Sequence, residues 1–225
     1  MKINIAIDGP SASGKSTIAK ALAKRLNYKH IDTGSMYRAC AYLALKHDLK
    51  PDDPKLVELV SESKFGFNEQ GHILLNDKDI DTKIRSKHVD LLTSTIAQNQ
   101  SIRTTLVNIQ QQMAMSKGYI LDGRDIGSVV LKDAELKVFQ TASIDSRAKR
   151  RLLEYQAKGI AVDYQTIHDE IELRDLQDQS REHSPLIQMP DAFVLDTSNL
   201  SIEQSVEQVY EWTKEVLMER GDTND

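Results

Sequence analysis

The chain has 225 residues, 40% of them hydrophobic, and a formal net charge of -5 at pH 7. It can bury a core as one domain with one or two inserted subdomains, which excludes disorder throughout. The negative charge gives no general attraction for nucleic acid, so an anionic ligand requires a local cluster of cations. Its one cysteine, Cys40, excludes an intrachain disulfide. Because MKINIAID lacks a signal-peptide core and no run approaches the roughly 20 apolar residues of a membrane helix, we expect a cytoplasmic protein without a membrane partner.

Short apolar runs alternate with helical patterns along the chain. The first run, 3–8, precedes a helical pattern at 16–26 that places Ile18 and Leu22 on one face. Four more runs follow, at 28–31, 119–121, 136–139 and 193–195. This alternation predicts an α/β protein with a five-stranded parallel sheet and helices on both sides of it.

Two regions interrupt the alternation. Between 63 and 85, short strand-like runs flank turn signals, which predicts small antiparallel hairpins within an insertion. Two polar helices parted by Gly159 fill 143–185 and suggest a mobile, charged lid. We therefore predict core segments at 1–38, 101–142 and 186–225, an insertion at 39–100 and a lid at 143–185.

A phosphate-binding loop lies between the first strand and the first helix. GPSASGKS, from Gly9 to Ser16, matches the pattern GxxxxGK[ST] in full. Its backbone N–H groups and the following helix N-terminus favour phosphate, Lys15 should reach the β- and γ-phosphates, and the Ser16 hydroxyl should bind Mg²⁺. The predicted nucleotide-binding residues are Gly9, Pro10, Ser11, Ala12, Ser13, Gly14, Lys15, Ser16 and Thr17.

Polar residues also follow two later strands, at the sheet edge where ligands of parallel sheets bind. The second run ends in DTGSMYR (32–38), and the third delivers Asp122, Arg124 and Asp125. An acid near Mg²⁺ and an arginine near phosphate suit phosphoryl transfer. No NKxD sequence is present, and NDKD at 76–79, which only resembles it, lies in the predicted insertion, so a GTPase is disfavoured.

The predicted lid carries two sets of charged residues at helical spacing. Arg147, Arg150 and Arg151 stand at i, i+3 and i+4, so all three can point to one place, where an anion would relieve their repulsion. The second helix is expected to hold its own set along one face. These residues are Arg174, Asp178 and Arg181. Exposed ion pairs on a solvated surface are the alternative explanation for both sets.

Four separated motifs closely resemble the bacterial cytidylate kinase family. They are IDGPSASGKST (7–17), DTGSMYR (32–38), DGRDIG (122–127) and RDLQDQSREHSPL (174–186). The resemblance covers nearly the whole chain, including the hairpin insertion. It implies a three-layer P-loop fold with an inserted NMP-binding subdomain and a helical lid. It also implies a monomer that transfers phosphate from ATP, with Mg²⁺, to CMP and dCMP, and no nucleic-acid partner.

The resemblance also implies roles for individual residues. Thr33, Tyr37 and Arg38 would line the acceptor site, with Arg103 and Arg124 on the CMP phosphate. Asp178 and Arg181 would read cytosine, whose exocyclic amine is a donor that a carboxylate accepts, whereas uracil presents a carbonyl. Asp125 and Arg174 complete the substrate set, and Arg147 joins the ATP set. The catalytic residues would be Lys15, Arg124, Arg150 and Arg151.

Three other functions stay open on the sequence. Another small-molecule P-loop kinase could act on UMP, a deoxynucleotide or shikimate. A regulatory protein could bind ATP without transferring phosphate and use the lid arginines on a partner. Nucleic-acid binding is the weakest of the three, because no basic stripe interleaved with aromatic residues is present.

Overall fold

The computed structural model describes residues 1–157 and 159–221. One residue of the predicted lid, Lys158, and the last four residues of the predicted C-terminal segment lie outside this description. The chain divides into two compact units, Met1–Lys29 with Lys117–Asp225, and His30–Ser116. Each unit is described by itself.

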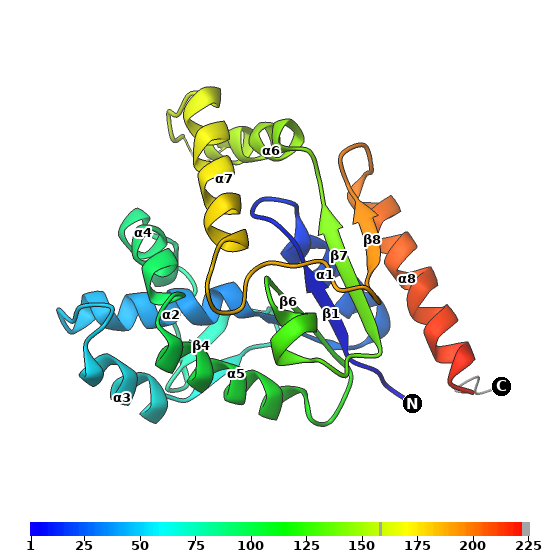
Figure 1. Cartoon of the computed structure of the whole chain (residues 1–225), viewed down its shortest axis with the longest axis horizontal. Helices are drawn as coiled ribbons and strands as arrows, with labels where there is room; N and C mark the ends of the chain where they lie inside the picture. Colours follow the sequence, from blue (N-terminus) through cyan, green and yellow to red (C-terminus); the bar gives the residue numbers. More distant parts are fainter. Residues whose placement is uncertain (158, 222–225) are drawn as a thin grey trace. The chain divides into compact units, whose positions relative to one another are not determined.

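The larger sheet has five strands in the order β2-β6-β1-β7-β8, of which Figure 1 labels β6, β1, β7 and β8. Both neighbours of β1 run parallel to it, and β8 runs parallel to β7. The strands are β1 (Ile5–Asp8), β2 (Lys29–Asp32), β6 (Tyr119–Gly123), β7 (Leu136–Thr141) and β8 (Phe193–Asp196). The predicted α/β class and five-stranded parallel sheet are therefore confirmed.

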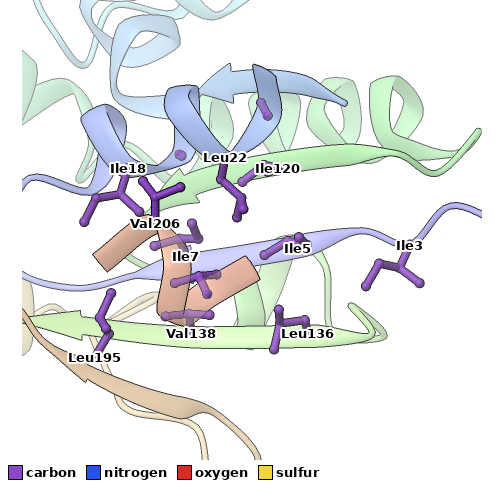
Figure 2. Close-up of a cluster of buried hydrophobic side chains, with 13 residues drawn as sticks. Ile3, Ile5, Ile7, Ile18, Leu22, Ile120, Leu136, Val138, Leu195 and Val206 are labelled. Atoms are coloured by element: carbon purple, nitrogen blue, oxygen red, sulfur yellow. The ribbon is translucent and has the colours of Figure 1, made fainter. Parts of the chain in front are cut away.

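Two helices of the first unit pack on one face of this sheet, α1 (Lys15–Leu26) and α8 (Ile202–Glu219). Alternate residues of a strand point to the same face, so Ile5 and Ile7 reach the same cluster as Leu22 and Val206, as Figure 2 shows. The α8 helix begins with a capping box formed by Ser201 and Gln204. This buried cluster holds β1, and the loop that follows it, against α1.

The remaining helices of the first unit follow β6 and β7. A short π-helical turn, η2 (Ile126–Val130), comes directly after β6. The helices α6 (Ile144–Ala157) and α7 (Tyr164–Gln179), which fall in the predicted lid, pack on each other through a small core of Ala148, Ile167 and Ile171. The charged helix pair predicted for this region is therefore present, with its own hydrophobic contact.

The second unit is helical with a small sheet. Strands β3, β4 and β5 pair antiparallel in sequence order, which confirms the predicted hairpins. Asn76 and Asp77 both have positive φ in the turn between the last two strands. The elements are α2 (Thr33–Lys46), α3 (Pro54–Glu62), β3 (Phe65–Phe67), β4 (Ile73–Leu75), β5 (Lys78–Asp79), η1 (Lys83–Arg85), α4 (Lys87–Ile96) and α5 (Gln100–Ala114).

Across residues 1–157 and 159–221, no helix has both the length and the apolar composition needed to cross a bilayer. The boundaries predicted for the core, insertion and lid segments stay a prediction.

Candidate active site

The loop from Gly9 to Ser16 joins β1 to α1 in the first unit. A Cβ on Gly9 would lie 1.9 Å from the backbone oxygen of Gln140, so only glycine fits there. Ala12 (φ 58°) and Gly14 (φ 89°) take the left-handed conformation. Left-handed residues that alternate with other residues in a turn point the backbone N–H groups inward, which forms a concavity that binds anions. The backbone of this loop is thus shaped for phosphate.

Lys15 is buried at the start of α1. Its Nζ donates to the backbone oxygen of Pro10 at 2.7 Å and to Ser13 Oγ at 3.3 Å, so the side chain lies over the loop. Burial lowers the pKa of Lys15 well below its ordinary value, and the nearby Arg124 lowers it further. A bound phosphate would favour the charged form of this lysine, because an adjacent anion raises the pKa of an ammonium group.

Ser16 and Asp122 bring two oxygen groups together. The Ser16 hydroxyl donates to Asp122 Oδ2 at 2.7 Å, which joins the start of α1 to β6. Hydroxyl and carboxylate oxygens are the ligand type that Mg²⁺ prefers, so this pair fits a magnesium ion bound together with nucleotide phosphates. Thr17, the next residue, is exposed.

A buried aspartate missed by the sequence prediction anchors the loop after β6. Asp8 accepts hydrogen bonds from the N–H groups of Ile126 and Gly127, at 2.8 and 2.7 Å. Burial raises the pKa of Asp8 to about 6 despite these two bonds, and the charge of Asp125 adds to the rise. Asp8 thereby fixes the chain two residues after Arg124. The only signal for it in the sequence is an acidic residue closing an apolar strand.

The three arginines of the predicted lid helix α6 contact different groups. Arg147 Nη1 donates to the backbone oxygen of Ser11 at 3.1 Å, and Arg150 Nη1 donates to that of Ser13 at 3.3 Å. Both therefore reach the phosphate-binding loop. The guanidinium of Arg151 lies 6.0 Å from the centre of the Tyr155 ring, on the same helix.

Arg147 also forms a buried ion pair that the sequence did not suggest. Its Nη1 lies 2.6 Å from Asp175 Oδ2 on α7, and its Nε donates to the backbone oxygen of Ala142 at 3.0 Å. Only 4% of the Arg147 side chain is exposed. The guanidinium of Arg147 therefore makes much of its hydrogen bonding with backbone and carboxylate oxygens of the protein. These contacts link α6 to α7 and to the phosphate-binding loop.

A second charged cluster lies at the end of α7. Arg124 Nε donates to Asp178 Oδ2 at 2.6 Å, and Arg181 donates to the other carboxylate oxygen. Burial alone would raise the pKa of Asp178, but the charges of Arg124, Arg181 and Arg174 outweigh it and hold that pKa below its ordinary value. Asp178 is thus a buried carboxylate kept ionised by arginines.

The expectation that Arg181 lies on the second lid helix is wrong. The α7 helix ends at Gln179, with Ser180 as its C-cap. Ser184 takes a positive φ before Pro185, and the N–H of Leu186 then bonds to the backbone oxygen of Asp178. Proline also disfavours a helical conformation for Ser184, the residue before it, and the chain has turned back by Leu186. Arg181 reaches Asp178 from the turn instead.

The second unit holds four of the predicted acceptor residues, which are Thr33, Tyr37, Arg38 and Arg103. Asp32 caps α2 by accepting from the Ser35 N–H at 3.0 Å, which places Thr33 and Tyr37 on its first turns. Both residues are buried.

Two arginines in this unit are held by neighbouring groups. Arg38 Nε pairs with Asp90 at 2.9 Å. The buried Arg103 donates to the backbone oxygen of Ala97 at 3.0 Å, and its guanidinium lies 5.4 Å from the centre of the Tyr37 ring. Tyr37 and Arg103 are thus neighbours, although 66 positions separate them in the sequence.

Comparison with known proteins gives one family. A family model described as cytidylate kinase matches residues 5–215. The chain is 46% identical to a cytidylate kinase of Caldicellulosiruptor saccharolyticus over 96% of its length and 97% of the relative's. Cytidylate kinases of Streptococcus agalactiae and Streptococcus pneumoniae are also 46% identical, over 96% and 92% of this chain and 97% and 95% of theirs.

Solved structures of low sequence identity share the fold. An uncharacterised protein from Eubacterium ventriosum superposes with a TM-score of 0.56 at 14% identity, over 95% of this chain and 99% of the other. A protein from Thermus thermophilus gives 0.51 at 14% identity, over 96% and 98%. These likenesses concern the fold alone.

Proposed function

The chain belongs to the cytidylate kinase family, and we propose that it transfers the γ-phosphoryl group of ATP to CMP, giving ADP and CDP. We include dCMP as a second acceptor. The observation that carries the proposal is the loop from Gly9 to Ser16, with buried Lys15 folded over it, in a chain 46% identical to proteins named cytidylate kinase over nearly its full length.

The donor site in this proposal is the phosphate-binding loop with its immediate neighbours. Backbone N–H groups of Gly9–Ser16 and the N-terminus of α1 bind the ATP phosphates, and Lys15 contributes the cation. Ser16 and Asp122 would hold Mg²⁺, which supplies charge neutralisation to the phosphates when bound. Arg150 and Arg151 are the lid arginines proposed to stabilise the transferring group.

The proposed acceptor residues are assigned one by one from the family resemblance. Arg103 and Arg124 are proposed to bind the CMP phosphate, because a planar guanidinium suits bidentate pairing with phosphate. Asp178 and Arg181 are proposed to read cytosine. The lowered pKa of Asp178 supports this role, since an ionised carboxylate is the acceptor that the cytosine amine requires. The remaining proposed acceptor residues are Thr33, Tyr37, Arg38, Asp125 and Arg174.

The chemistry needs no covalent intermediate. The acceptor phosphate is already ionised near neutral pH, so we assign no general base. Phosphoryl transfer spreads negative charge over the equatorial oxygens, and alignment with electrostatic stabilisation supplies most of the rate. Lys15, Arg124, Arg150 and Arg151 are the proposed catalytic residues. Lid closure would exclude water and suppress ATP hydrolysis.

A monomeric state and a cytoplasmic location complete the proposal. Gel filtration with light scattering tests the first, and fractionation of cells expressing the chain tests the second.

The deciding experiment is a coupled assay of ADP release with Mg·ATP and one acceptor at a time: CMP, dCMP, UMP, AMP or shikimate. We expect fast turnover with CMP and dCMP and little with UMP, because uracil would place a carbonyl oxygen, and not an amine donor, against the Asp178 carboxylate. Fast turnover with UMP or shikimate and not CMP would establish a different P-loop kinase. ATP binding without turnover on any acceptor would establish a regulatory nucleotide-binding protein instead.

A further inference from the structure

Three side chains from outside the phosphate-binding loop converge on one backbone oxygen within it. The Ser13 oxygen accepts from Gln140 Nε2 at 2.5 Å, from Arg150 Nη1 at 3.3 Å and from Thr197 Oγ1 at 3.3 Å. The side chains of Ser13, Gln140 and Thr197 are all buried. A carbonyl oxygen has two lone pairs, so three donors saturate it.

Thr197 lies at the centre of this group, directly after β8. Its backbone N–H donates to the Thr141 oxygen at 2.9 Å, which fixes the residue against the end of β7. Its hydroxyl accepts from Arg150 Nη1 at 3.2 Å and shares its single proton between the oxygens of Ser13 and Thr141, at 3.3 and 3.1 Å. Arg150 also donates to the backbone oxygen of Thr197. Loss of this hydroxyl therefore removes its hydrogen bond to the Ser13 oxygen of the loop and the one that it accepts from Arg150.

Gln140 donates to the same Ser13 oxygen, but burial of its side chain costs folding free energy. Its side chain is fully buried, and its Oε1 has no hydrogen-bond partner among the residues that the structure describes. An orphaned buried acceptor is destabilising, and a leucine of similar volume would avoid it. The bond to Ser13 is what the amide contributes at this position.

The anchored oxygen determines where the next N–H points. The peptide bond is planar and trans, so the Ser13 C=O and the Gly14 N–H point in opposite directions. Gly14 has φ 89° and no side chain to resist rotation of this peptide. Donors that hold the oxygen outward therefore hold the Gly14 N–H toward the inner side of the loop, where phosphate oxygens bind.

We propose that Thr197 and Gln140 are positioning residues for the donor phosphates, acting through the Ser13–Gly14 peptide. This inference deepens the donor site of the proposed function and rests on it. No contact between either side chain and the nucleotide is required.

The test compares Thr197→Val, which removes the hydroxyl at nearly constant volume, with Thr197→Ser, which keeps it. Calorimetry with Mg·ADP gives the Kd without any acceptor, and the coupled assay gives KM for ATP and for CMP separately. Inorganic tripolyphosphate, as an inhibitor competitive with ATP, probes the phosphate site without a nucleoside. We expect Thr197→Val to raise the Kd for Mg·ADP, the KM for ATP and the inhibition constant of tripolyphosphate about 5- to 10-fold each. This is the effect of losing one hydrogen bond. The KM for CMP should stay within about 2-fold, and Thr197→Ser should recover.

Three results would overturn the proposal. Unchanged Mg·ADP binding in Thr197→Val would show that the anchor does not matter. Weaker ATP binding with unchanged tripolyphosphate inhibition would show that Thr197 serves the nucleoside. Equal losses for ATP and CMP would show a general structural defect. If Thr197→Val fails to fold, Gln140→Leu decides by the same constants, with an expected loss of about 2- to 5-fold. Since Mg·ADP binding needs no acceptor, a wild-type protein inactive on CMP would defeat the proposed function and leave this comparison intact.

Discussion

Two buried aspartates of the first unit respond to burial in opposite ways. Asp8 accepts from two backbone N–H groups, and its pKa rises to about 6. Asp178 lies between Arg124 and Arg181, and its pKa falls below the ordinary value. Amide dipoles do not offset the loss of water around Asp8, whereas full positive charges do so for Asp178.

The phosphate-binding loop and the charged cluster at the end of α7 also differ in the partners of their polar groups. Around the phosphate-binding loop, side chains such as Gln140 and Arg150 hold backbone oxygens, so the loop geometry is built into the fold. At the end of α7, the proposed ligand-binding residues Arg124, Asp178 and Arg181 hold one another. Charge pairs of this kind can exchange a protein partner for a ligand of the same charge. The proposed donor site is thus preorganised, whereas the arginines of the proposed acceptor cluster would exchange Asp178 for a ligand anion.

We expect the largest effect from a substitution of Lys15, the buried lysine over the phosphate-binding loop. Lys15→Met should lower kcat by roughly 10²- to 10³-fold, because the transferring phosphoryl group loses one aligned positive charge. Steady-state kinetics with CMP measure it, and Lys20→Met, an exposed lysine of the same helix, is the control. A Lys15→Met enzyme within a few-fold of wild-type kcat would remove Lys15 from the mechanism.

The second largest effect should come from a substitution of Asp178, in the charged cluster at the end of α7. Asp178→Asn should lower kcat/KM for CMP about 10- to 100-fold and narrow the preference over UMP, because an amide offers both a donor and an acceptor to either base. Asp169→Asn changes an exposed carboxylate of the same helix and should leave both constants unchanged. Thermal unfolding must accompany the kinetics, since loss of a buried charge partner also destabilises the fold. An unchanged ratio of CMP to UMP activity would show that Asp178 does not read the base.

The lid arginines test whether contact with the loop matters. Arg150→Ala should slow transfer about 10-fold and also raise KM for ATP, because Arg150 bonds to the Ser13 oxygen. Arg151→Ala should slow transfer with ATP binding preserved. Lys149→Ala, an exposed neighbour, serves as the control. Wild-type turnover in either arginine variant would refute the role of that arginine.

The smallest effect is the pH dependence that Asp8 confers on stability. Its pKa is about 6 in the folded protein against 3.8 as the ordinary value, so the native state binds a proton more readily than the unfolded chain. This contribution to stability is present below pH 4 and is lost as the pH rises through 6. Relative to Asp8→Asn, the wild-type free energy of unfolding should therefore increase by on the order of 1 kcal/mol from pH 7.5 to pH 5. Urea unfolding of both proteins at the two pH values measures it. A difference that is constant with pH would show that Asp8 does not titrate in this range.

Much of the fold was predictable because it depends on local patterns. The five strands follow apolar runs of a few residues, and the hairpins of the second unit follow turn signals at Asn76 and Asp77. The phosphate-binding loop was predictable for the same reason, since Gly9 and Gly14 meet backbone requirements that few other residues can meet. The end of α7 was placed too late because helical spacing continues through Arg181, whereas the helix ends at Gln179 and the chain then turns back.

By itself, the sequence determined the α/β class and the position of the loop between β1 and α1, and it supplied the residues that we propose for phosphate and base. Only the tertiary structure decided which partner each buried polar group has. Asp8 meets N–H groups 118 and 119 residues away, and the Ser13 oxygen meets Gln140 and Thr197, 127 and 184 residues away. Spacing within a helix or strand carries no information about such contacts, because they arise where parallel strands from distant parts of the chain end at the same edge of the sheet.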